Sequence, residues 1–368
     1  MRFEKHIVKK QKRKRRFETV LSIFILLAIF LGGVTGYYSS KVMGFLDGIS
    51  VETEESEEDM LKYKKQLDEL EPFSAVILGL DVEDGGNSRS DTIIVLTVNP
   101  QSEDIKMVSI PRDTLITLPD GLTEKINAAH SSGGARMARD VIGDYLDIDI
   151  DFYATMDFNG LVELVDAVGG VNVDSDLAFS QSDYKNPGQS VKIVEGEQHL
   201  MGNEALAYAR MRKVDPRGDF GRQDRQQQVI IGVLEQLISF NTISNLNGIL
   251  SAIRPYLKTN ATPNNMLTIA TNYRNAAKNI DRLVLDGYAD TTYFPHYGHD
   301  VYSWHAYDSS LIEVQNELKK HLGLEISEEE YYEPEYYEEE TYEEEYYEPE
   351  YYEEETYEEE TYDSELGY

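Results

Sequence analysis

Arginine and aspartate side chains gather in four short segments of the sequence, and their types and spacing could support chemistry on a phosphorylated anion. The segments are LGLD (78–81) with RSDT (89–92), SIPRDT (109–114), EKINAAH (124–130), and AYARMR (207–212) with DFGRQDRQ (219–226). The planar guanidinium group of arginine suits bidentate contact with phosphate oxygens. Several arginines concentrated in an acidic chain indicate an anionic ligand, although scattered surface ion pairs remain the alternative for any single arginine.

Three of these charged residues stand where predicted strands meet loops. Asp81 follows one continuous apolar run, Asp91 begins the next, and Arg112 comes off a third. Carboxylates at strand ends can share a hard cation such as Mg²⁺, which prefers oxygen ligands and keeps bound waters. For the two aspartates, turn residues at strand ends are the alternative explanation.

The remaining charged positions are spaced so that they could act together. Arg210 and Arg212 are two residues apart, so an extended chain would point both side chains the same way. Asp219, Arg222 and Gln226 fall on one face of a predicted helix, near an N-terminus that would stabilise an anion.

The periodicity of apolar residues predicts the strands and helices that position these charged residues. Strands are predicted at 73–80, 91–98, 105–110 and 280–285, with a short strand after the glycine pair at 169–170, and helices at 133–146, 157–168, 203–208, 222–240, 243–257, 263–278 and 308–322. One apolar stripe of the helix at 222–240 is formed by Ile230, Val233, Leu234, Leu237 and Ile238. Buried strands alternating with helices predict an α/β domain over 72–323, with a central β-sheet covered by helices on both faces.

An uncharged run of 22 residues at 19–40 follows a basic segment at 1–18. About 20 apolar residues cross a bilayer as a helix, and positive residues stay on the cytoplasmic side. The pattern predicts a single-pass anchor in the cell membrane, with a cytoplasmic N-terminus and the domain outside. A cleaved signal peptide and a buried helix are the alternatives. Residues 41–71 are interpreted as a spacer with a possible short helix at 59–70.

Residues 324–368 form a low-complexity tail, in which EYYEPEYYEEETYEE repeats with a period of 15 residues. From residue 328 onwards the tail has 21 acidic and no basic residues, so charge repulsion predicts disorder rather than a solenoid. The tail supplies -21 of the formal net charge of -34, and the body of the chain is also acidic. An acidic body argues against a nucleic-acid partner, because phosphate backbones are bound by Lys and Arg. The chain has no cysteine, which excludes disulfides, thiolate metal sites and a cysteine nucleophile.

The blocks RSDT, IPRD, KINAAH, and ARMR with DFGRQDRQQ resemble, in order and spacing, the signature of the LytR-CpsA-Psr family of cell-wall glycopolymer transferases. The resemblance covers residues 73–323 and implies an α/β/α fold with an apolar groove for a polyprenyl chain. By position it implies that Asp81 and Asp91 hold Mg²⁺, that Arg112, Lys125, Arg210, Arg212, Arg222 and Gln226 bind a pyrophosphate, and that Asp219 and Arg112 are the catalytic candidates.

The reaction that this resemblance implies is Mg²⁺-dependent transfer of a glycopolymer from a polyprenyl-pyrophosphate carrier to peptidoglycan. The glycopolymer could be teichoic acid, capsule or another secondary wall polymer. A peptidoglycan hydroxyl, by analogy O6 of N-acetylmuramic acid, would attack the phosphorus next to the glycan, and polyprenyl phosphate would leave. Positioning and electrostatics would dominate catalysis. Asp219 or Asp91 could take the hydroxyl proton, but a metal-bound aspartate is the poorer base.

Two other functions are consistent with the same sequence features. A polyprenyl-pyrophosphate hydrolase would have the same cationic site with water as the acceptor. A non-enzymatic wall-binding or regulatory membrane protein would need no reaction, but DNA-linked regulation requires a reading element, and only a short basic segment is predicted inside the cell.

Two weaker patterns favour structural explanations. The tripeptide RGD at 217–219 is recognised by some adhesion receptors, but here it lies inside a signature block. His296, His299 and His305 in a Tyr-rich predicted loop lack the helical spacing of a zinc protease. His130 is expected to orient its loop rather than to bind a metal.

Overall fold

The protein is described by a computed structural model over residues 55–81, 88–238, 249 and 252–326. The predicted cytoplasmic segment at 1–18, the predicted anchor at 19–40 and the tail beyond 326 lie outside these residues. Among the residues that are described, no helix is long and apolar enough to cross a membrane.

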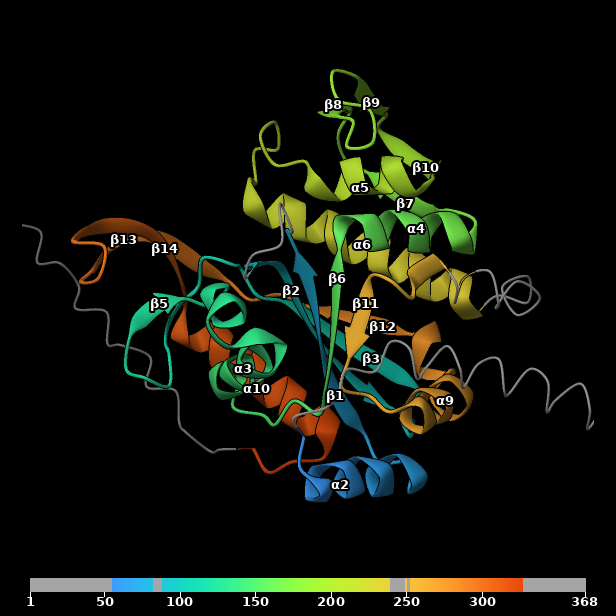
Figure 1. Ribbon diagram of the computed structural model, residues 1–368, viewed down its shortest axis with the longest axis vertical. Helices are drawn as coiled ribbons and strands as arrows, with labels where there is room; N and C mark the ends of the chain where they lie inside the picture. The colour runs from blue at the N-terminus through green and yellow to red at the C-terminus, as the bar shows by residue number, and fades with distance from the viewer. Residues whose placement is uncertain (1–54, 82–87, 239–248, 250–251, 327–368) are drawn as a thin grey trace, which may run out of the picture. The chain divides into compact units, whose positions relative to one another are not determined.

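The centre of the domain is a six-stranded mixed sheet with the strand order β11-β6-β1-β2-β3-β12 (Figure 1). Its strands are β1 (Phe73–Leu80), β2 (Ser90–Asn99), β3 (Asp104–Ser109), β6 (Phe152–Asp157), β11 (Leu257–Thr259) and β12 (Ile280–Leu283). The pairs β1–β6 and β3–β12 are parallel, and the other neighbours are antiparallel. The segments predicted as strands at 73–80, 91–98, 105–110 and 280–285 are therefore all in the central sheet, whereas β6 and β11 were not predicted.

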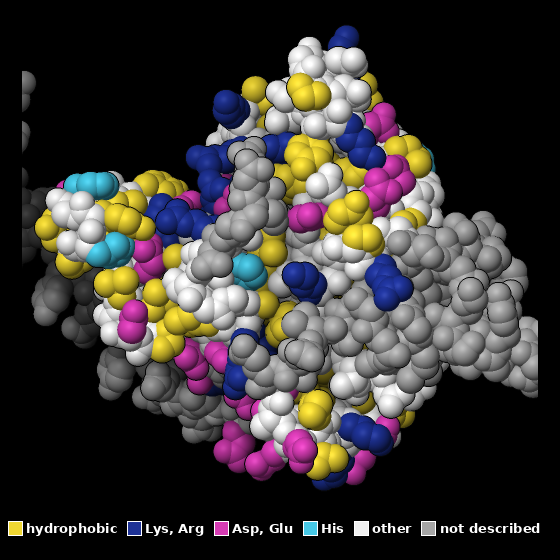
Figure 2. All heavy atoms as spheres, viewed as in Figure 1, with side chains coloured by type: hydrophobic (Ala, Val, Ile, Leu, Met, Phe, Trp, Pro, Cys, Tyr) yellow, Lys and Arg dark blue, Asp and Glu magenta, His cyan; other side chains and the backbone are white. Residues whose placement is uncertain are grey.

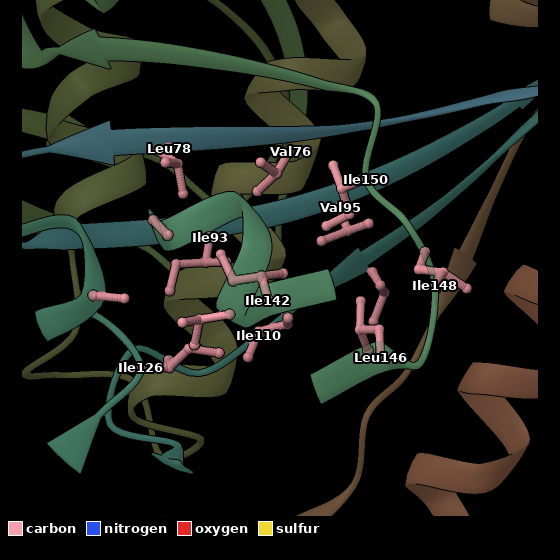
Figure 3. Packing of buried hydrophobic residues seen from close by; sticks show 14 of the residues in the cluster. Val76, Leu78, Ile93, Val95, Ile110, Ile126, Ile142, Leu146, Ile148 and Ile150 are labelled. Carbon is pink, nitrogen blue, oxygen red and sulfur yellow. The ribbon is translucent and has the colours of Figure 1, made fainter. Parts of the chain in front are cut away.

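Helices α3 (Ala128–Leu146) and α10 (Asp308–Leu322) cover one face of this sheet. Val76, Leu78, Ile93 and Val95 point to that face and pack against apolar side chains of the two helices, among them Ile142 (Figure 3). These four strand residues alternate along β1 and β2, as side chains on one face of a strand must.

The opposite face is covered by α2 (Glu57–Asp68), α9 (Pro263–Asn272) and the short 3-10 helix η1 (Ala276–Lys278). Ile94 and Leu96, the alternate residues of β2, pack here. The prediction of helices on both faces is thus confirmed. Tyr63 and Leu67 of α2 are also buried in this layer, so part of the segment interpreted as a spacer belongs to the packed domain. The helix begins at a capping box formed by Ser56 and Asp59.

A second layer lies beside the sheet and contains the helices that carry Arg210, Arg222 and Arg225 of the signature blocks. It consists of α4 (Phe158–Val168), α5 (Gly202–Arg210), α6 (Asp219–Ile238), β7 (Val171–Ser175), β8 (Phe179–Ser182), β9 (Ser190–Ile193) and β10 (Gly196–Leu200). Asp157 caps the N-terminus of α4, and Gly169 ends it with a φ of 92°, a left-handed conformation that glycine adopts without steric cost. The helix stop and the short strand predicted around 169–171 are therefore confirmed.

Two hairpins complete the domain next to the ends of the central strands. One joins β4 (Leu115–Thr117) to β5 (Thr123–Lys125), and the other joins β13 (Gly287–Phe294) to β14 (His299–Ala306). An isolated parallel bridge between Thr114 and Trp304 links them. The Tyr-rich segment predicted as a loop was therefore interpreted wrongly, since most of it is paired strand.

Candidate active site

Arg112 and Arg222 meet at the end of the central sheet, each beside an aspartate. Arg112 follows β3, and its Nη1 lies 2.8 Å from Oδ2 of Asp91 in β2. Arg222 is in the first turn of α6, where its Nη2 lies 2.9 Å from Oδ1 of Asp219 and donates to the Asp91 carbonyl at 3.4 Å. A strand end, a loop and a helix N-terminus thus bring together residues separated by more than a hundred positions.

The electrostatics of the two arginines differ. Burial opposes the charged form of Arg112, but the carboxylates of Asp91 and Asp113 outweigh it and raise its pKa. Burial lowers the pKa of Arg222, and the positive charge of Arg112 adds to that effect against the opposing carboxylate of Asp219. Nε of Arg222 is buried and has no hydrogen-bond partner in the described part of the chain. A buried, unsatisfied guanidinium nitrogen beside a second arginine suits a bound anion.

Lys125 joins this cluster through Asp113, a residue of the IPRD block that received no role from the sequence. Its Nζ lies 2.7 Å from Oδ1 of Asp113, while Nε of Arg112 lies 3.5 Å from the other carboxylate oxygen. Asp113 therefore holds two cations of the predicted pyrophosphate site at once. The pairing of β4 with β5 brings Lys125 back towards Asp113.

An apolar cavity of about 410 Å³ opens between α4, α5, α6 and residues of the central strands β1 and β6. The stripe predicted on α6 lines it through Ile230, Val233, Leu234 and Leu237. The side chain of Ile238, the fifth residue of that stripe, is not described. The stripe therefore faces a cavity that could hold an apolar chain.

Polar side chains also stand in the wall of this cavity. Arg210 and Gln226 are among its lining residues, as is Asp157. The guanidinium carbon of Arg210 lies 4.7 Å from the centre of the Phe158 ring. An apolar cavity with an arginine and an amide in its wall fits an amphiphile that has an anionic head group.

Arg212 has different surroundings from Arg210. Arg210 is still helical as the last residue of α5, and Met211, which follows it, adopts an extended conformation. The prediction that an extended chain would point both arginines the same way was therefore wrong in its premise. Arg212 is exposed and contributes positive potential at Arg222.

The predicted metal ligands lie at the same end of two neighbouring strands. Leu80 pairs with Ser90 in the antiparallel ladder of β1 and β2, beside an irregularity in the register at Gly79 and Leu80. Asp81 directly follows Leu80 and Asp91 directly follows Ser90, so both lie near this end of the two strands. Asp81 is exposed, and Asp91 contacts Arg112. Within the described residues, no group of three or more His, Asp or Glu side chains could hold a metal ion. Two carboxylates suit a Mg²⁺ ion that takes its other ligands from water and a bound phosphate.

The histidines of the weaker patterns have structural partners. Nε2 of His296 contacts Glu124 at 2.9 Å, and the His305 ring stacks on Tyr288. Nδ1 of His130 lies 2.7 Å from the Ser88 carbonyl, which ties the start of α3 to the segment before β2.

A family model, LytR_cpsA_psr family, matches residues 41–320 of the chain. The chain belongs to the LytR-CpsA-Psr family. Among its relatives is the polyisoprenyl-teichoic acid–peptidoglycan teichoic acid transferase TagU of Halalkalibacterium halodurans, which is 44% identical over 257 residues, or 69% of this chain and 80% of that protein. The transferase of the same name from Bacillus subtilis is 35% identical over 317 residues, or 85% of this chain and 98% of that protein.

Solved structures of the LytR-CpsA-Psr family share the fold. The crystal structure of B. subtilis TagV matches with a TM-score of 0.60 and 34% identity, over 70% of this chain and 99% of that chain. A structure of TagT bound to LI-WTA matches with a TM-score of 0.57 and 27% identity, over 69% of this chain and 92% of that chain.

The loop between α5 and α6, which contains Arg212 in this LytR-CpsA-Psr protein, is held by a buried ion pair. Nη1 of Arg225 lies 2.7 Å from Oδ2 of Asp215, and neither side chain is exposed by more than 1%. Gly221 lets α6 pass directly beside that carboxylate, because a Cβ there would clash with it. Arg217 of the RGD tripeptide also contacts Asp215, so it belongs to the same network. Gly221 and Arg225 lie in the DFGRQDRQQ block, whereas Asp215 precedes it and received no role from the sequence.

Proposed function

We propose that this protein transfers a glycopolymer from a polyprenyl-pyrophosphate carrier to peptidoglycan. The observation that carries the proposal is the junction between the apolar cavity and the cationic cluster. Arg210 and Gln226 line the cavity, and Arg222 lies one helical turn before Gln226 on α6. A polyprenyl pyrophosphate has this same division between an apolar chain and an anionic head group. The names of the TagU relatives support a wall polymer as the transferred group and peptidoglycan as the acceptor.

The arginines would bind the pyrophosphate by exchanging their present carboxylate partners for phosphate oxygens. Arg112 and Arg222 now pair with Asp91 and Asp219, and both guanidinium groups contact Asp91, one at its carboxylate and the other at its backbone carbonyl. Charge that develops on the phosphoryl oxygens would meet fixed positive groups that are largely shielded from water. Arg112 is therefore the strongest candidate for stabilising the transition state.

The reaction would form one P–O bond and break another. A peptidoglycan hydroxyl oxygen attacks the phosphorus next to the glycan, the bridging P–O bond breaks, and polyprenyl phosphate leaves with that bond's electron pair. The hydroxyl proton passes to a base. Asp219 suits this role better than Asp91, because Asp91 is expected to contact the cation.

Asp81 and Asp91 would hold Mg²⁺ together with the pyrophosphate, and the ion would neutralise part of the charge on the phosphates. The domain would lie outside the cell membrane, anchored by residues 19–40. In that compartment the pyrophosphate bond of the donor supplies the free energy that ATP cannot.

Purified full-length protein with a polyprenyl-pyrophosphate-linked glycan and soluble peptidoglycan strands tests the proposal. The expected result is release of polyprenyl phosphate that depends on the acceptor, together with glycan attached to the strands. Release at the same rate without the acceptor would instead identify a hydrolase. No consumption of the donor under any condition would favour a non-enzymatic protein.

A further inference from the structure

The β13–β14 hairpin presents two exposed tyrosines on one of its faces. Tyr293 pairs with Asp300, and Tyr302 pairs with Thr291, two residues further along the ladder. Side chains alternate between the faces of a strand, so Tyr293, Tyr302 and Trp304 share one face, while Tyr288 belongs to the other. Tyr293 and Tyr302 are diagonal neighbours, a spacing that aromatic side chains can bridge.

This face is continuous with the candidate active site. Nζ of Lys125 lies 5.5 Å from the centre of the Tyr302 ring. The Trp304 ring meets the Phe220 ring edge-to-face at 6.1 Å, and Phe220 follows Asp219 directly. The backbone N–H of Trp304 donates to the Asp113 carbonyl at 2.9 Å. Figure 2 shows Lys and Arg side chains gathered beside this hairpin, which is marked by its cyan histidines.

The exposure of the rings indicates a surface for a ligand rather than a packed layer. Tyr293 is 58% exposed, Tyr302 is 49% exposed and Phe220 is 41% exposed. Each tyrosine offers a flat apolar ring together with a polar hydroxyl. A pyranose ring has the complementary surface, with C–H groups on its faces and hydroxyls around its rim. Rigid aromatic rings bind such partners at a low cost in conformational entropy.

The hairpin face and the apolar cavity adjoin different parts of α6, so the acceptor and the donor would occupy different surfaces. The cavity is lined by α6 from Gln226 to Leu237, whereas Phe220, at the start of α6, contacts the hairpin. A donor whose lipid occupies the cavity and whose pyrophosphate binds the arginines has its reacting phosphorus on the hairpin side. The acceptor hydroxyl must reach the phosphorus from there. An acceptor strand continues in both directions, so it needs an open surface such as this one.

We propose that the hairpin face carrying Tyr293 and Tyr302 is the docking surface for the acceptor, an amino-sugar glycan strand of peptidoglycan. This inference rests on the proposed transfer function and deepens it. The Tyr302 ring lies over Lys125 of the candidate active site, and Tyr293 extends the surface towards the tip of the hairpin.

Two measurements on the full-length protein test the docking surface, with soluble uncross-linked peptidoglycan strands as the probe. In transfer assays, the double variant Tyr293→Ala/Tyr302→Ala should need about tenfold more acceptor for half-maximal rate, with an unchanged requirement for donor. Tyr288→Ala on the opposite face is the matched control and should behave as the wild type. Tyr302→Phe should keep acceptor binding, because it retains the ring.

The second measurement is binding without donor. Trp304 is the only tryptophan of the chain, so intrinsic fluorescence reports from this face. Strands should change the fluorescence of the wild type and of Tyr288→Ala at similar concentrations, and the double variant should need about tenfold more. Equal titrations for all three proteins would overturn the proposal, as would a change confined to the donor requirement. If even the wild type transfers nothing, the proposed function fails, and the titration still decides whether the hairpin binds glycan.

Discussion

The guanidinium of Arg112 lies 2.8 Å from the carboxylate of Asp91, so a predicted pyrophosphate ligand and a predicted metal ligand neutralise each other in the free protein. A divalent cation would have to displace Arg112 from Asp91. Pyrophosphate offers Arg112 another anion and supplies further oxygens for the cation.

We therefore expect Mg²⁺ and pyrophosphate to bind together. Calorimetry should show weak or undetectable binding of Mg²⁺ alone, and clear binding once pyrophosphate is added, since two carboxylates are too few for a tight site. Asp91→Asn should abolish the dependence of pyrophosphate binding on Mg²⁺. Tight binding of Mg²⁺ to the free protein would contradict this account of the site.

Replacing Arg112 by Lys should lower the transfer rate by about 100-fold, because lysine keeps the charge but loses the planar pair of donors. The melting temperature should change little. Arg136→Lys is the matched control, since Arg136 lies on the solvent side of α3 with 44% of its side chain exposed. Normal transfer by Arg112→Lys would exclude bidentate phosphate binding by this residue.

A polar residue in the apolar cavity should weaken the binding of long-chain donors. Leu161 lines the cavity, and Leu161→Asn should raise the half-saturating concentration of a full-length polyprenyl donor about tenfold. A donor with a short, soluble lipid should be affected much less. Leu61→Asn makes the same change at a site that is 68% exposed and should have no effect. Equal losses with both donors would mean that the lipid does not occupy this cavity.

The Asp215–Arg225 pair should make stability depend on pH in the acid range. Burial opposes the ionised form of Asp215, but hydrogen bonds from Arg225 and Arg217 outweigh it and lower the pKa of Asp215. A carboxyl group whose pKa is lower in the folded state stabilises the fold at pH values above its unfolded-state pKa, which is about 3.9. That stabilisation is lost as the pH falls through the folded-state pKa.

At pH 7, Asp215→Asn should reduce the free energy of unfolding by about 3–5 kcal/mol, because Arg225 stays buried without its partner. Urea unfolding should show that the gap between variant and wild type narrows below pH 4, roughly the pKa of an unpaired aspartate. Asp68→Asn, which removes an exposed partner of Lys64, should cost less than about 1 kcal/mol. A gap that stays constant down to the acid limit would argue against this pairing.

Strands β1 and β2 could be predicted from the sequence because each is a continuous apolar run that is largely buried. Strand β6 is also in the central sheet, but its sequence FYATMD contains no such run, and it was missed. The predicted strand at 73–80 has the same bounds as β1. Short or exposed strands were missed because distant partners determine them. The burial pattern of β13 is mostly exposed, and its pairing depends on β14 and on the contact of that strand with Thr114.

Contacts between residues of the candidate active site could be predicted from the sequence only where the residues lie close together in the chain. Arg222 and Asp219 are three residues apart on one helix, and their contact was foreseeable. The contact between Asp113 and Lys125 depends on the β4–β5 hairpin, which periodicity did not reveal. The apolar stripe of α6 has the same period whether it lines a core or a cavity, so only the structure distinguishes the two.

The central claim is that a phosphodiester passes from lipid to peptidoglycan, and the fate of one phosphorus atom tests it most directly. A donor carrying ³²P in the phosphate next to the glycan should be incubated with the full-length protein, Mg²⁺ and soluble peptidoglycan strands. The account predicts that the label becomes attached to the strands while unlabelled polyprenyl phosphate is released, and that Arg112→Lys slows both events equally. Label recovered as free glycan phosphate, or retained on the lipid, would contradict it.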